Sequence, residues 1–258
     1  MAGDVTSRPV RSGQPLVTGG HRSPVIRTLS GLALGGVAVT SVVFAALHLL
    51  PPTSGISAVH RTISEYALTS SAWAFDLGVI ALCGASVAVF AALVMLRRIR
   101  ALSAGTVFGA LWVAGLLTLV GFPKHNWALG GSASSGQIHR LASLVAFLAL
   151  PIAVLAISRR RGRPAQGAAA RCAFWLGVLS FAWFSPIVVA VLTAPRAWWQ
   201  QIPLGLVERG LALSEVLAVV ALALSVRTDS TGAGPSGVQN RGQLTDLVRT
   251  DAAATADQ

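Results

Sequence analysis

The side chains that could do chemistry fall in short groups separated by long apolar runs. These groups are His60-Arg61 with Glu65, Asp76, His139-Arg140, Glu208-Arg209 and Glu215. Histidines and carboxylates together can bind a transition metal, relay protons or activate a serine. No HxxxH or HExxH spacing is present. Metal ligands would therefore have to come from separate elements of the fold.

Three interpretations of these groups stay open. A metal could be held by histidines with a carboxylate, the donors being His48, His60, His125 and His139 with Asp76 or Glu208. A nucleophilic triad of Ser64, His139 and Asp76 would need all three to meet. The simplest interpretation is structural ion pairing inside a helix bundle, among Asp76, Arg140, Glu208 and Arg209. We predict no bound metal and no cofactor, and we expect a protein that is not an enzyme.

The composition indicates which elements must position these groups. Of 258 residues, 53% are hydrophobic and only 11% are charged, and the mean hydropathy is +0.67. Soluble domains carry about 25% charged residues. These values exclude a disordered chain, a coiled coil and an ordinary soluble enzyme. Two cysteines are too few for a disulfide scaffold or a cysteine-rich zinc domain.

Six apolar stretches are long enough to cross a bilayer, which takes about 20 residues of helix. They are residues 28–50, 73–96, 101–122, 139–157, 172–194 and 204–226. Backbone groups in lipid must be satisfied within each span, so each is predicted to be a helix. The fold class is therefore an all-α membrane protein, a six-helix transmembrane bundle over 28–226. The polar segments 1–27 and 227–258 are expected to be disordered.

The basic residues predict the orientation of this bundle. Fifteen of the 20 Lys and Arg residues lie on the side that holds both termini, which predicts cytoplasmic termini. The net charge of +11 is thus a topology signal. We expect membrane lipids as partners and no nucleic acid. Small-residue pairs at Gly31/Gly35 and Gly105/Gly109 favour packing within the chain, with an oligomer through these faces as the alternative.

With this topology, the scarce ionisable groups gather at the outer side. Asp76, His139, Arg140, Glu208 and Arg209 are expected to converge at an outward-facing pocket, together with His60 and Glu65. Residues 62–65 fit a capping box, with Thr62 as cap and Glu65 reaching back, which predicts a short interfacial helix. Glu215 shares a face of its helix with Glu208. It lies about 16 Å below the outer end of that helix, where a carboxyl group must pair, stay protonated or meet water.

Short motifs in a fixed order resemble the membrane family called domain of unknown function 998. They are RTISEYAL at 61–68 followed by Trp73, GFP at 121–123, HRLAS at 139–143 and LVER at 206–209. The resemblance covers residues 28–226 and implies a six-helix bundle in a bacterial plasma membrane, with no assigned activity. Lys124 stands where the family typically has an acidic residue. More remotely, the outer Ile-Ser motif and the histidine of the fourth span resemble the Frag1/DRAM/Sfk1 group of six-span proteins.

The function predicted from the sequence is correspondingly broad. We expect a multi-pass plasma-membrane protein that binds a lipid headgroup or a small polar ligand in the outward-facing pocket. The alternatives are a metal-dependent membrane hydrolase and a proton-coupled small-solute transporter that uses Glu215. The sequence favours no particular ligand.

Overall fold

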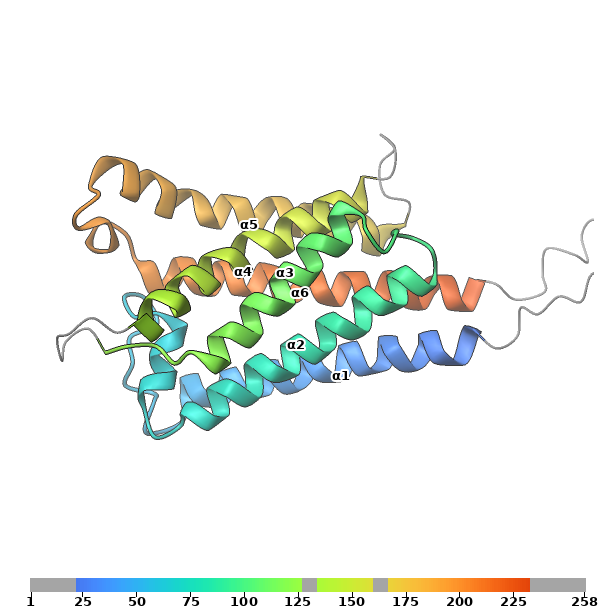
Figure 1. Cartoon of the computed structure of the whole chain (residues 1–258). Coiled ribbons are helices and arrows are strands. Elements are labelled where there is room, and N and C mark those ends of the chain that lie inside the picture. Colours follow the sequence, from blue (N-terminus) through green and yellow to red (C-terminus); the bar gives the residue numbers. More distant parts are fainter. Residues whose placement is uncertain (1–21, 127–133, 160–166, 233–258) are drawn as a thin grey trace, which may run out of the picture.

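Six long helices form one bundle in the computed structural model, which describes residues 22–126, 134–159 and 167–232 (Figure 1). The helices are α1 (Arg22–Leu49), α2 (Ala72–Met95), α3 (Ala104–Gly121), α4 (Ser134–Ser158), α5 (Ala168–Thr193) and α6 (Leu204–Gly232). Two short 3₁₀ helices, η1 (Ile63–Leu68) and η3 (Trp198–Gln200), lie in the connections. The end of the bundle that carries η1 is called the η1 end below.

The predicted all-α fold with six apolar spans is confirmed. Each long helix contains a window with a mean hydropathy between 1.8 and 2.5, so each is long and apolar enough to cross a membrane. α1 begins at Arg22, before the predicted start at residue 28, and α6 continues to Gly232, beyond residue 226. Helical hydrogen bonding thus continues past the apolar stretches. The rest of the two terminal segments, 1–21 and 233–258, lies outside the described residues.

The helices pack as three sequential hairpins, α1 with α2, α3 with α4 and α5 with α6. α2 and α6 are the most enclosed of the six. α2 contacts α1, α3 and α6, whereas α6 contacts α1, α2, α4 and α5. Among the ionisable side chains of α6, Glu215 is buried and Glu208 and Arg209 are half-buried, whereas Arg227 is exposed.

The two glycine pairs differ in their surroundings. A Cβ at Gly105 would meet Ile157 of α4, and one at Gly109 would meet the ring of Phe90 on α2. This pair permits close packing within the chain, as predicted. In the part of the chain that the structure describes, a Cβ at Gly31 or Gly35 would meet no atom within 4 Å.

α1 and α6 touch near the chain termini and diverge toward the η1 end (Figure 1). Near the termini, the Ser30 hydroxyl donates to the Ala223 carbonyl at 3.1 Å. At the other end, the connection that contains η1 lies against the start of α6, where the Leu206 amide donates to the Val59 carbonyl at 3.1 Å.

Candidate ligand-binding cavity

The η1 segment is held by α6. The predicted short helix is present with Thr62 as its N-cap residue, but the capping-box bonds are absent. The Thr62 hydroxyl instead lies 3.3 Å from the Ser64 hydroxyl, and it accepts a hydrogen bond from the Lys124 ammonium. The Ile63 amide donates to the Glu208 carboxylate at 2.6 Å. A carboxylate from another helix therefore satisfies the free N–H of the first residue of η1, which is not one of the two N–H groups that the predicted capping box would satisfy.

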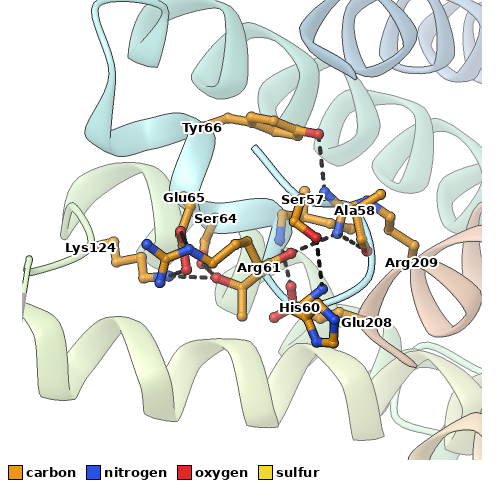
Figure 2. A network of polar contacts seen from close by, with 12 residues as sticks. Ser57, Ala58, His60, Arg61, Ser64, Glu65, Tyr66, Lys124, Glu208 and Arg209 are labelled. Atoms are coloured by element: carbon orange, nitrogen blue, oxygen red, sulfur yellow. Dashed lines mark hydrogen bonds and ion pairs between the residues drawn. The ribbon is translucent and has the colours of Figure 1, made fainter. Parts of the chain in front are cut away.

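Arg209 fastens the same segment with several hydrogen bonds, as Figure 2 shows. Its guanidinium donates to the carbonyls of Ala58 at 3.0 Å and Arg61 at 2.7 Å. It also donates to the Tyr66 hydroxyl at 3.0 Å, which in turn lies 3.1 Å from Nδ1 of His48 on α1. The planar fork of arginine suits such multiple bonding. Arg209 thus connects α6, the η1 segment and α1.

Gly205 permits this close approach of the η1 segment to α6. A Cβ at this position would collide with the carbonyl oxygens of Arg61 and Ala58. The sequence offers no signal for this requirement, because the partner atoms lie far away along the chain.

A small charged network covers the outer face of η1 (Figure 2). Glu65 pairs with Arg61 at 3.1 Å and with Lys124 at 3.6 Å. Lys124 follows α3 and is mostly buried. Burial lowers the pKa of its amine, while the negative charges of Glu65 and Glu208 act in the opposite direction. Lys124 therefore joins the α3–α4 connection to the η1 segment, a role that the sequence analysis missed.

Beneath this network lies a cavity of about 380 Å³, lined by α1, η1, α2, α3, α4 and α6. Most of its wall is apolar, including Phe44, Phe75, Leu82, Trp112 and Leu116. The polar part of its wall includes His48, Tyr66, His139, Glu208, Arg209 and Glu215. A mainly apolar pocket with a few polar groups is the usual form of a small-molecule site.

Two of these polar side chains are buried without protein partners for their reactive atoms. His139 is 3% exposed, and its Nδ1 lies 2.9 Å from the Phe122 carbonyl. Since a carbonyl only accepts, Nδ1 carries the proton and Nε2 of the neutral ring is an acceptor. Within the described residues, Nε2 of His139 and both carboxyl oxygens of Glu215 have no partner. Glu215 is 1% exposed.

The structure places the predicted site residues in three groups. His139, Glu208, Arg209 and Glu215 line the cavity. Glu65 belongs to the charged network above it. The remaining three do not line it: Asp76, Arg140 and His60.

Helix geometry explains why those residues are separated. Neighbouring residues on a helix point about 100° apart. Phe75 lines the cavity, so Asp76 points elsewhere from α2. His139 is directed inward, so Arg140 is exposed on α4. His60 is exposed in the connection before η1.

His48 and Tyr66 also line the cavity, although neither was among the residues predicted to form the pocket. Tyr66 is the only tyrosine of the chain, and its position in the RTISEYAL motif was the available signal. Among the described residues, no group of three His, Cys, Asp or Glu side chains lies close enough to hold a metal ion.

The bundle and its enclosed polar groups define a multi-pass membrane protein. Residues 21–225 match the family described as Protein of unknown function (DUF998), and the chain belongs to this family. This result confirms the resemblance noted from the motifs. No curated protein and no solved structure matches the chain.

Proposed function

We propose that this protein binds an amphipathic molecule in the cavity, one that carries a hydroxyl or amine on an apolar body. The observation that carries this proposal is the pair of buried side chains, His139 and Glu215, which line the cavity and have polar atoms without a partner among the described residues. Burying a polar group without a partner costs about 1–3 kcal/mol. A ligand that supplies the missing partners recovers that free energy on binding.

The chemistry of the two groups narrows the ligand. Nε2 of His139 accepts a hydrogen bond, because its other nitrogen donates to Phe122. The Glu215 carboxyl group can accept from a hydroxyl or an ammonium group. Both therefore favour a donor. The aromatic and aliphatic walls suit an uncharged hydrocarbon part, and aromatic faces also tolerate a nearby cation.

The topology that accompanies this proposal has both termini in the cytoplasm of a bacterial cell. Its support is the excess of arginine at the end of the bundle that holds the termini. The η1 end, with the cavity, then lies in the outer half of the plasma membrane. An enzyme reporter fused after Lys124 tests this orientation, and activity of a cytoplasmic reporter at this position would contradict it.

The binding proposal is tested by extracting the purified protein with organic solvent and identifying bound molecules by mass spectrometry. The variants are His139→Leu and Glu215→Leu. Asp76→Asn and Arg140→Gln are matched controls, because these polar residues do not line the cavity. We expect the wild type and both controls to retain the molecule.

Loss of a hydrogen bond costs about 0.5–1.5 kcal/mol between neutral groups and about 1.5–3 kcal/mol when one group is charged, so each cavity variant should retain about twofold to a hundredfold less. A wild-type protein that carries no amphipathic molecule would contradict the proposal. So would equal retention by the cavity variants and the controls.

A further inference from the structure

The lining of the cavity shows where it opens. Almost all lining residues are buried or half-buried, and only three are exposed. Ser41 and His48 belong to α1, and Leu213, which is 59% exposed, belongs to α6. The mouth therefore lies between α1 and α6, the two helices that diverge toward the η1 end (Figure 1).

The depth of this mouth places it in the membrane. Ser41 lies eight residues before the end of α1 at Leu49, and Leu213 lies nine residues after the start of α6 at Leu204. At 1.5 Å per residue, both are about 12–14 Å from the η1 ends of their helices. Half of a hydrocarbon core is about 15 Å thick. The mouth thus extends from His48, at the interface, into the hydrocarbon of one leaflet.

The size of the cavity limits what can lie inside it. Ligand pockets range from about 300 to 1,000 Å³, and 380 Å³ is close to the lower end. A membrane lipid can place only part of itself in this volume. The rest must pass through an opening whose exterior is apolar, and an opening between two membrane helices meets that condition.

We infer that the occupant is a lipid of the leaflet at the η1 end, which enters sideways between α1 and α6. One hydrocarbon chain extends through the mouth beside Ser41 and Leu213, and the polar part meets His139 and Glu215. This inference rests on the proposed function and specifies its ligand class and route. It assigns α1 and α6 the role of a lateral portal, which a ligand arriving from water would not need.

Trp112 provides a direct test, because its ring lines the cavity and is only 2% exposed. A protein with Trp112 as its single tryptophan is made by replacing the others with phenylalanine, namely Trp73, Trp127, Trp175, Trp183, Trp198 and Trp199. It is reconstituted in vesicles of phosphatidylglycerol, whose headgroup hydroxyls can donate hydrogen bonds and whose chains carry bromine, a contact quencher. Because surrounding lipid cannot touch Trp112 from outside, quenching reports a chain inside the cavity. A variant retaining only the exposed Trp175 is the positive control.

We expect Trp112 to lose most of its emission in brominated vesicles. The double variant Ser41→Phe, Leu213→Phe narrows the mouth and should restore emission. The matched pair Val42→Phe, Leu217→Phe changes exposed neighbours on the same helices that do not line the cavity, and it should leave quenching unchanged. Melting temperatures of all variants check folding.

Lateral access is refuted if Trp112 stays bright while Trp175 is quenched, or if narrowing the mouth has no effect. If solvent extraction still yields a bound molecule in that case, the proposed function survives and only the route and source are wrong. If extraction also yields nothing, both proposals fail.

Discussion

The η1 end and the middle of α6 each present a glutamate to the cavity, and the two glutamates differ in their contacts. Glu208 accepts the Ile63 amide at 2.6 Å and is influenced by the positive charges of Lys124 and Arg209. Glu215, two turns further along, has no partner among the described residues. The comparison shows that a shared helix face does not imply a shared role. The carboxylate of Glu208 holds the η1 segment, and that of Glu215 has no partner among the described residues.

The comparison of the two glutamates also indicates that the fold contains an energetically unfavourable group at Glu215. A buried polar group without a partner is unfavourable by about 1–3 kcal/mol, so such groups are rare except at functional sites. The hydrogen bond of Glu208 links α6 to the η1 segment, whereas Glu215 is a buried carboxyl group without a partner among the described residues. Substitutions of the two glutamates should therefore act in opposite directions.

The largest effect is expected at Arg209. Arg209→Met removes bonds to two carbonyls and to Tyr66, and it leaves the neighbouring Glu208 with less positive charge nearby. Each hydrogen bond from a charged donor contributes about 1.5–3 kcal/mol, so calorimetry in detergent should detect the loss of several such bonds as a lower melting temperature. Arg209→Lys keeps the charge without the fork and should lose less. An unchanged melting temperature in the methionine variant would show that the η1 segment is not held by this residue.

The two glutamates themselves give the next largest effect. In protein freed of bound lipid, Glu215→Leu should raise the free energy of unfolding by about 1–3 kcal/mol, because it removes a buried unpartnered group. Glu208→Leu should lower it by a similar amount, because the Ile63 amide loses its acceptor. Both variants are measured by the same chemical unfolding. If both change the free energy of unfolding in the same direction, the two glutamates do not differ in their contribution to stability.

A smaller effect is expected at Gly205. Gly205→Ala gains up to about 1 kcal/mol of helix propensity, but its Cβ collides with the backbone of Ala58 and Arg61, which costs about 1–3 kcal/mol. The net result is a loss of about 1 kcal/mol in thermal unfolding. Gly35→Ala, which meets open space, should be neutral or stabilising. If both variants lose a comparable free energy of unfolding, the loss comes from placing alanine in the helix and not from the contact of α6 with the η1 segment.

The smallest effect concerns pH. Burial lowers the pKa of Lys124 in the folded protein, so the unfolded chain binds more protons between the lowered pKa and the ordinary lysine value. In that alkaline window this residue makes the free energy of unfolding rise with pH. We expect this change in the free energy of unfolding to be below about 1 kcal/mol, because Lys124 and Glu65 form a charge pair that is partly exposed to solvent.

The measurement is the pH dependence of unfolding in the wild type and in Lys124→Met. The methionine variant should lack the rise that comes from this residue. The free energy of unfolding of the wild type minus that of Lys124→Met should rise with pH in this window. If this difference falls instead, the pKa of Lys124 is not lowered in the folded protein.

The membrane spans were predictable because apolar length is a local property. The first predicted span ends at residue 50 and α1 ends at Leu49, and Thr62 is the N-cap residue of η1 as predicted. Which residues face the interior was harder to predict. α2 is apolar on all sides, so its sequence does not show that Phe75 turns inward and Asp76 does not.

The long-range contacts could not be predicted from the sequence. Nothing near Ile63 in the sequence indicates that Glu208 accepts its amide proton, or that Lys124 bonds with Thr62. These contacts depend on how the hairpins dock. The inward direction of His139 and Glu215 agreed with the expectation that ionisable groups avoid lipid.

The position of Tyr66 makes the molecule its own spectroscopic reporter. As the only tyrosine in the chain, it can be replaced biosynthetically by fluorotyrosine to give a single fluorine resonance. Its hydroxyl lies between Arg209 and His48, so that one signal responds to α6, to the η1 segment and to α1 at once. A change at any of these contacts could then be followed in the purified protein through the exchange of one hydrogen atom for fluorine.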